Sequence, residues 1–432
     1  MLKQILCNKS NYEKKLFSYV NKANIEDKKR SAIVSSIIKN IKINKNKALI
    51  NYSNKLENNN FKNFKNLKVT QTEITDALSK CSQEFHNSIK LAVQRVTSYQ
   101  KKLMPRNLFY EDKLGIKLGS IWSSLESCCL YVPGGKALYP SSVIMNAIPA
   151  KIAGVKRIVI TTPANNNKLS PEILVAAHAV GINEIYKVGG AQAVAALTFG
   201  TESIKRVDKI VGPGNSFVAE AKKQLYGYVG IDSIAGPSEI LVIADKDNNP
   251  AWVAMDLLSQ AEHDEEARAI LISDSKDFIK KVNKYLSDFL KSINRKKIAS
   301  KSIKKNGLAI LIQDLNFAYY IANYIAPEHL EIMSKNKNFL AKKITNAGAI
   351  FMGEYTPEAF GDYIAGPSHV LPTSGNARFD SGLSVLDFLK RTSYIQANKT
   401  GLKKMLYSIE ALGNSEGLDA HVKSAKIRFS KD

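Results

Sequence analysis

Short β-rich runs alternate with amphipathic stretches of helical length from about Ile121 to Met352. We expect strands at residues 130–132, 157–161, 184–188, 209–211, 239–244, 269–272, 308–312 and 349–352. We expect helices between them at residues 143–152, 172–180, 191–198, 215–225 and 252–261, and a long lysine-rich helix after residue 272. This alternation predicts βαβ units and parallel sheets. The rhythm breaks at Ala235-Gly236-Pro237-Ser238, which divides the chain into two α/β sections.

Length and composition indicate a soluble, cytoplasmic protein. The chain has 432 residues, enough for two large domains, and no apolar run approaches the roughly 20 residues that cross a bilayer. We expect no membrane association and no signal peptide, because the first residues contain no long apolar core. The four cysteines form no CxxC pair, and adjacent Cys128 and Cys129 have poor geometry for a disulfide, so a reducing compartment is expected.

A formal net charge of +23 raises the alternative of a nucleic-acid-binding protein. Lys outnumbers Arg 52 to 10, whereas nucleic-acid sites favour Arg for bidentate and stacking contacts. The lysines are densest before Lys68 and between Lys280 and Lys305, in regions with a helical pattern. We therefore interpret most of the charge as solvated helix surface and expect no nucleic-acid partner.

Three βα turns of the first section contain glycine pairs: Pro133-Gly134-Gly135, Gly189-Gly190 and Gly212-Pro213-Gly214. Glycines at strand ends let backbone N–H groups and helix N-termini approach a phosphate, and open α/β sheets bind ligands at such ends. None of the three completes the pattern G-x-G-x-x-G, and any one alone is equally well a tight turn. Together they favour a nucleotide cofactor.

Four of the six histidines lie beside acids or amides in the second half of the chain. Gln260 and His263 are three residues apart at a helix end, so both side chains project from one face and could form half of a metal site. Asp362 and His369 are expected in a glycine-bearing loop, and His421 has only Glu416 nearby. Each segment alone could be ordinary surface. Together, Gln260, His263, Asp362 and His421 offer N and O ligands that allow zinc, manganese or iron.

Glu328-His329 follows Pro327, which is expected to end the preceding helix. An adjacent acid and imidazole could divide base work between two proton transfers. A surface turn is the alternative interpretation of this segment.

The residues in these segments resemble the histidinol dehydrogenase family from about residue 25 to the C-terminus. The matching stretches are LYVPGGKALYPSSVIMNAIPAKIAG, VGGAQAVAALTFGTESI, VDKIVGPGNSFVAEAKKQLYG, IDSIAGPSEILVIAD, LLSQAEHD, APEHLEI, GDYIAGPSHVLPTSG and GLDAHVKSAKIR. Several rare tetrapeptides recur in order, so the resemblance is specific.

The resemblance implies an aldehyde-dehydrogenase-like α/β fold with two incomplete Rossmann-like domains and small terminal appendages. We expect a helical appendage at residues 1–25, a metal and substrate domain at 26–130 and 238–381, and an NAD-binding domain at 131–237. Residues 382–432 would pack on the partner subunit of an intertwined homodimer. This segment would contribute Glu416 and His421 to the partner's site.

The resemblance also implies oxidation of L-histidinol to L-histidine through L-histidinaldehyde, with two NAD+ and one Zn2+ per subunit. Zinc would be bound by Gln260, His263, Asp362 and His421. His329 would be the base for alcohol oxidation, and Glu328 would activate water on the aldehyde. Implied substrate contacts, beyond the metal ligands and His329, are Ser238, His369 and Glu416, and implied NAD contacts are Tyr131, Gln192 and Asn215.

One alternative enzyme is an aldehyde dehydrogenase with Cys128 or Cys129 as its nucleophile. Both cysteines fall in the probable strand SCCLYV, where a buried structural role is the simpler interpretation. The nucleic-acid alternative leaves the set of Gln, His and Asp residues unexplained.

Overall fold

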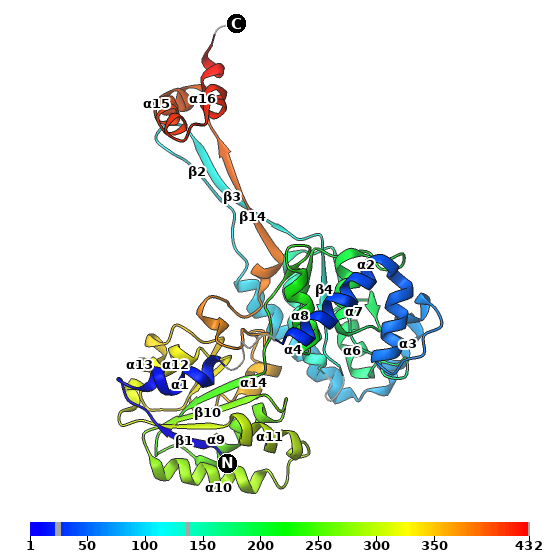
Figure 1. Cartoon of the computed structure of the whole chain (residues 1–432), viewed down its shortest axis with the longest axis vertical. Helices are drawn as coiled ribbons and strands as arrows, with labels where there is room; N and C mark the ends of the chain where they lie inside the picture. The colour runs from blue at the N-terminus through cyan, green and yellow to red at the C-terminus, as the bar shows by residue number, and fades with distance from the viewer. Residues whose placement is uncertain (22–26, 135–138, 431–432) are drawn as a thin grey trace.

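The computed structural model describes residues 1–21, 27–134 and 139–430. Within them the chain forms two parallel sheets, each covered by helices, and a narrow antiparallel arm that extends away from both (Figure 1). The α/β fold with parallel sheets is therefore confirmed. None of the helices in these ranges is long and apolar enough to cross a membrane.

The larger sheet has six parallel strands in the order β1-β11-β10-β9-β12-β13. Its strands are β1 (Lys3–Leu6), β9 (Glu239–Ile243), β10 (Arg268–Ser273), β11 (Leu308–Leu311), β12 (His329–Ile332) and β13 (Ala349–Met352). Its helices are α1 (Tyr12–Asn21), α9 (Pro250–Ala261), α10 (Lys276–Phe289), α11 (Lys296–Asn306), α12 (Ala318–Ile325), α13 (Lys337–Lys343) and α14 (Glu358–Tyr363). Alternate residues of β9 enter two different cores, Leu241 and Ile243 on one face and Ile240 and Val242 on the other. Burial on both faces explains the continuous apolar run.

The smaller sheet has five parallel strands in the order β6-β5-β4-β7-β8. Its strands are β4 (Ser127–Tyr131), β5 (Arg157–Thr161), β6 (Ile185–Tyr186), β7 (Lys209–Val211) and β8 (Gly230–Ile231). The helices around it are α2 (Lys28–Leu56), α3 (Gln71–Lys80), α4 (Gln83–Lys102), α5 (Pro140–Ala153), α6 (Pro171–Ala179), α7 (Gly190–Phe199) and α8 (Ser216–Leu225).

Two segments join a different sheet or adopt a different structure from the one that the expected domain division gave them. β1 pairs in parallel with β11, so the start of the chain is an edge strand of the larger sheet rather than a helical appendage. The helices α2, α3 and α4 bury residues such as Val34, Ile74 and Val96 in the two cores of the smaller sheet. Residues 28–102 therefore belong structurally with the smaller sheet, because their apolar faces are covered there.

The arm is a three-stranded antiparallel sheet in the order β14-β3-β2. It is built from β2 (Leu108–Glu111), β3 (Lys117–Ser124) and β14 (Leu389–Gln396), and it carries α15 (Lys399–Ser415) and α16 (Asp419–Lys426) at its far end (Figure 1). Short 3-10 helices occur at Phe64–Leu67, Leu315–Phe317, Asn376–Arg378, Val385–Phe388 and Ile427–Phe429. The arm exposes large apolar side chains, with Ile395 at 74% and Tyr407 at 83% of full exposure.

Two local predictions and one alternative interpretation differ from the structure. The single lysine-rich helix after residue 272 is two helices, α10 and α11, and the Ser292 hydroxyl donates to the Phe289 carbonyl where the first one ends. Asp362 lies in the short helix α14 rather than in a loop. Glu328-His329 is not a surface turn, because both side chains are buried at the start of the central strand β12.

Candidate active site

The predicted catalytic residues gather where the amino ends of two central strands of the larger sheet meet. Ser238 immediately precedes β9, Glu328 immediately precedes β12, and His329 is the first residue of β12. His329 and Ile240 are register partners in the β9–β12 pair, so these strand starts are adjacent. Gln260 reaches the same edge from the last turn of α9. One edge of one sheet therefore collects residues from widely separated parts of the sequence.

His329 is the centre of this site and is only 3% exposed. Its Nδ1 lies 3.1 Å from the Glu239 carbonyl oxygen, and its Nε2 lies 3.5 Å from Asp362 Oδ1 without making a hydrogen bond. Burial alone lowers the pKa of His329, but the carboxylates of Glu358, Glu328 and Asp362 outweigh that effect and hold it well above its usual range. The imidazole is thus a strongly proton-binding group at the centre of the site.

Glu328 is a buried carboxylate beside this imidazole. Its Oε2 accepts a hydrogen bond of 2.8 Å from the Glu239 backbone N–H and lies 3.6 Å from His329 Nδ1. Burial raises the pKa of Glu328 to about 7, and His329 opposes that shift. A carboxylate that exchanges protons near neutral pH is suited to general base catalysis.

Gln260 is fully buried between His329 and Glu358. The amide orientation that satisfies its surroundings directs the nitrogen to both carboxylate oxygens of Glu358, the longer contact being 3.2 Å. The amide oxygen then lies 3.3 Å from His329 Nδ1 and 3.2 Å from the Glu239 nitrogen. Glu358 also accepts a bond of 3.3 Å from the Ser259 hydroxyl, and burial raises its pKa to about 8.

Asp362 faces three imidazoles. Burial alone would raise the pKa of its carboxyl group, but the close contact and charge interaction with His329, and the charges of His369 and His263, bring it below its usual value. Burial lowers the pKa of His263, whose ring lies 6.5 Å from the Tyr139 ring between centroids. His263 and Asp362 are therefore near enough for their charges to interact.

These residues fit a divalent cation. One ligand atom each on His329, Glu358 and Asp362 lies within 4.8 Å of the others, and His329 Nε2 is buried without a hydrogen-bond partner. All the donors are nitrogen or oxygen, the type that zinc accepts alongside thiolate. This triad and the predicted set of Gln260, His263, Asp362 and His421 have Asp362 in common.

His369 joins the two parts of the molecule at this site. Its Nε2 lies 3.0 Å from the Ser142 hydroxyl on α5, and its Nδ1 lies 3.0 Å from the Asp362 carbonyl oxygen. Burial lowers the pKa of the His369 imidazole. Because α5 covers the smaller sheet, this contact brings that sheet's helix layer against the segment that carries Asp362.

The predicted NAD contacts gather at the carboxyl ends of the smaller sheet. The Tyr131 hydroxyl, at the end of β4, accepts a bond of 3.0 Å from the Gly190 N–H at the start of α7. The Gln192 amide donates a hydrogen bond of 2.7 Å to Glu57, and Asn215 caps the N-terminus of α8.

The glycine turn after β7 also lies at this edge. Gly212 has a φ of 106°, and a Cβ there would collide with the Tyr131 carbonyl oxygen. The N-termini of α7 and α8 thus lie at one edge, the edge at which open α/β sheets bind phosphate-bearing cofactors. Gly135, in the first glycine turn, lies outside the described residues.

Glu416 and His421 do not reach this site within one chain. Glu416 ends α15, His421 lies in α16, and both are exposed at the far end of the arm (Figure 1). Their predicted roles thus need a second chain.

Sequence reasoning missed Glu358 and Glu57. Glu358 precedes Asp362 by four residues on α14, a spacing that places both on one helix face and could have signalled the pair. Glu57 accepts bonds from the Gly189 N–H and from Gln192, at 2.8 Å and 2.7 Å, and burial raises its pKa to about 7. Nothing near Glu57 in the sequence points to that turn.

The structure argues against the cysteine alternative. Cys128 and Cys129 are fully buried in β4, and burial raises the pKa of Cys128 to about 12, so neither thiol ionises readily near neutral pH.

We expect a Cys128→Ala/Cys129→Ala variant to keep dehydrogenase activity within about twofold, since removing a covalent nucleophile would instead abolish turnover. NADH formation by the purified variant, with Cys7→Ala as a control for loss of a buried thiol, measures this. Loss of turnover in a folded variant would restore the nucleophile hypothesis.

Comparison with known proteins gives a consistent result. The family model described as histidinol dehydrogenase matches residues 20–429. The chain is 47% identical over 423 residues to a histidinol dehydrogenase of Agrobacterium fabrum, covering 98% of both chains. It is 52% identical over 356 residues to histidinol dehydrogenase 1 of Nostoc sp., covering 82% of this chain and 83% of the relative.

Solved structures agree with these matches. The crystal structure of histidinol dehydrogenase from Elizabethkingia anophelis superposes with a TM-score of 0.93 at 34% identity, covering 99% of this chain and 98% of that one. An acetylating aldehyde dehydrogenase from Geobacillus thermoglucosidasius gives a TM-score of 0.50 at 13% identity, covering 90% of this chain and 98% of that one. The second likeness concerns the fold alone and agrees with the expected aldehyde-dehydrogenase-like architecture.

Proposed function

The chain belongs to the histidinol dehydrogenase family, and we propose that its active site lies between the amino ends of β9 and β12 and the carboxyl ends of β4 and β7. The family is NAD-dependent, uses zinc and oxidises L-histidinol in histidine biosynthesis. The observation that carries the proposal is the buried His329, flanked by Glu328 and Asp362 and joined through His369 to the helix layer of the smaller sheet.

We assign the metal to Gln260, His263, Asp362 and the partner subunit's His421, with one Zn2+ per subunit. The contacts of Gln260 and Asp362 with the two nitrogens of the His329 ring, and the charge interaction of His263 with Asp362, support the assignment. When bound, zinc supplies a fixed positive charge that orients the amino group and imidazole of L-histidinol. His329 and Glu358 lie close enough to serve as ligands, but we assign His329 to proton transfer and Glu358 to holding the Gln260 amide.

The two oxidations need two kinds of proton transfer. In the first, His329 takes the hydroxyl proton of L-histidinol as the carbon gives up a hydride, which leaves L-histidinaldehyde. In the second, Glu328 takes a proton from the water that adds to the aldehyde, and the hydrate gives up the second hydride to yield the carboxylate. NAD+ supplies the hydride acceptor in both. Burial and mutual contact of Glu328 and His329 support this division.

The remaining contacts complete the pocket. Ser238, at the start of β9, and His369, against α5, are proposed to touch the substrate from the chain's own side. Tyr131, Gln192 and Asn215 are proposed to contact NAD, because they surround the two helix N-termini at the carboxyl edge of the smaller sheet. The smaller sheet is then the NAD-binding unit, and the larger sheet is the metal and substrate unit.

We propose a homodimer in which the arm of each subunit brings Glu416 and His421 to the partner's site. Exposure of Phe109, Ile395 and Tyr407 on the arm supports this, since large apolar side chains gathered on a protruding element mark an interface. We also propose a cytoplasmic location, which the four free cysteines support.

The metal assignment predicts that His263→Ala loses most bound zinc and nearly all NADH formation from L-histidinol. Metal content after dialysis measures the first effect without reference to activity. His178→Ala, at an exposed position of α6, is the matched control and should keep about one zinc per subunit. A His263→Ala enzyme with full zinc and full activity would contradict the assignment.

A further inference from the structure

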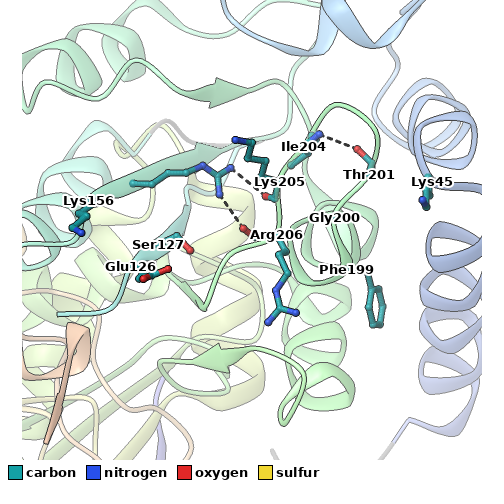
Figure 2. Close-up of a pocket in the computed structure, with 11 residues that line it drawn as sticks. Lys45, Glu126, Ser127, Lys156, Phe199, Gly200, Thr201, Ile204, Lys205 and Arg206 are labelled. Atoms are coloured by element: carbon teal, nitrogen blue, oxygen red, sulfur yellow. Dashed lines mark hydrogen bonds between the residues drawn. The ribbon is translucent and has the colours of Figure 1, made fainter. Parts of the chain in front are cut away.

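An open, solvent-facing cavity lies at the other edge of the smaller sheet, away from the proposed cofactor site (Figure 2). Its volume is about 690 Å³. Ser127 and Arg157, the first residues of β4 and β5, lie in its wall, whereas Tyr131 ends β4 at the opposite edge. The cavity is lined by Lys45, Glu126, Ser127, Lys156, Arg157, Phe199, Gly200, Thr201, Ile204, Lys205 and Arg206.

The lining is strongly cationic. Five of its side chains are basic, and Glu126 is its one acid. Arg157 is compensated by Glu184, at 2.8 Å, but Lys156, Lys205 and Arg206 form no ion pair within the described part of the chain. Three cations of the hollow therefore have no ion-pair partner among the described residues, whereas Arg157 pairs with Glu184 and Lys45 has a charge interaction with Glu202.

Lysines on the helices of the larger sheet are only partly paired. Lys280, Lys291 and Lys301 each lie within 3.1 Å of a carboxylate, whereas the exposed Lys281 and Lys284 of α10 form no ion pair among the described residues. Unpaired lysines by themselves therefore do not mark a site. Their gathering in a concave region is the feature that points to an anionic ligand.

The wall that carries these cations is held in place by its own hydrogen bonds. Arg157 donates to the Arg206 carbonyl at 2.9 Å and to the Lys205 carbonyl at 3.1 Å, which fixes the end of the loop (Figure 2). The Thr201 N–H donates a hydrogen bond of 2.8 Å to the Ile204 carbonyl oxygen. The Ser203 hydroxyl donates one of 2.7 Å to the Asn46 side chain on α2. A fixed backbone lowers the ordering cost of binding at this loop.

Lys45 approaches the cavity from the opposite wall. It lies within α2 but has a φ of 43°, a left-handed conformation that costs a non-glycine residue on the order of 1 kcal/mol. This kink interrupts α2 where it borders the cavity. The cations therefore come from α2, from the start of β5 and from the loop after α7.

We propose that this cavity binds a small molecule carrying two or more phosphate groups. Its volume is in the range of small-molecule sites, roughly 300–1,000 Å³. Several separate cations suit an extended multivalent anion better than a single carboxylate. Phe199 and Ile204 provide an apolar wall for the remainder of such a ligand.

The test measures binding of ATP and of inorganic pyrophosphate to the full-length enzyme by calorimetry, without NAD+, because NAD+ itself carries two phosphate groups and would compete for the site. We expect Lys205→Ser/Arg206→Ser to weaken binding of both probes by about tenfold or more, since two charge-assisted contacts are lost. Lys281→Ser/Lys284→Ser removes the same charge from exposed positions of α10 and should change affinity by less than about twofold. NADH formation from L-histidinol should be unchanged in both variants, which shows that they are folded.

Three results would overturn the proposal. One is the absence of probe binding at millimolar concentration to an active enzyme. Another is equal weakening by both double variants, which would mean general attraction to a basic surface. The third is tight binding of single-stranded RNA that the Lys205→Ser/Arg206→Ser variant weakens while ATP and pyrophosphate bind poorly, which would make the surface a nucleic-acid site. If the enzyme still oxidises L-histidinol in each of these cases, the proposed dehydrogenase function stands and only the phosphate-binding proposal is wrong.

Discussion

Glu328→Gln is expected to slow the oxidation of supplied L-histidinaldehyde by a factor on the order of 10²–10⁴, the usual effect of removing a general base. The amide oxygen of Gln can still accept the 2.8 Å bond from the Glu239 N–H, so the substitution removes the base with little disturbance of the backbone. Oxidation of L-histidinol to the aldehyde level should be slowed much less, because that proton is assigned to His329. Single-turnover NADH formation from each substrate measures the two steps separately.

The companion variant His329→Asn should slow alcohol oxidation at least as much as the aldehyde step. Glu331→Gln is a matched control, because Glu331 is a buried carboxylate two residues along β12 that accepts a bond from the Glu358 N–H. The Glu331→Gln variant should not slow one half-reaction more than the other. Equal and small losses in both half-reactions for both Glu328→Gln and His329→Asn would contradict the assigned division of roles.

Patterns of hydrophobicity were sufficient to predict most of the two sheets. β5, β7 and β13 have the predicted bounds, because each is a short run rich in Ile, Val or Phe. β1 was not predicted, since three of its four residues are exposed and it is an edge strand with polar residues. β12 was not predicted either. It has only four residues, and the glutamate within it is buried by contacts to distant segments rather than by the strand's own pattern.

The candidate site was predictable only where its residues are neighbours in sequence or share a recognisable family pattern. Gln260 with His263 and Glu328 with His329 are local pairs, and the structure brings both pairs to one sheet edge. Glu358 was missed, because its contact with the Gln260 amide spans almost a hundred residues and depends on how α14 packs against α9. Tertiary contacts of this kind leave no periodic signal.

The arm carries a residue whose role could not be predicted from its sequence neighbours, and it allows a direct test of subunit assembly. His421 looked isolated in the sequence, and within one chain it remains exposed in α16 far from Asp362 (Figure 1). A side chain that serves as a metal ligand should lie beside other ligands. We therefore propose that the arm crosses to a second subunit, so that each active site is built from two chains.

Subunits with His421→Ala and subunits with His263→Ala should each be inactive as homodimers, yet refolding them together at equal amounts should restore activity. In a mixed dimer one site collects both substitutions and the other collects neither. With random pairing half the dimers are mixed, so about a quarter of wild-type NADH formation returns if the sites act independently. Refolding His263→Ala with His178→Ala subunits is the control for the yield of refolding. If mixed dimers form but no activity returns in the first mixture, His421 acts in its own subunit's site and the arrangement across the interface is wrong.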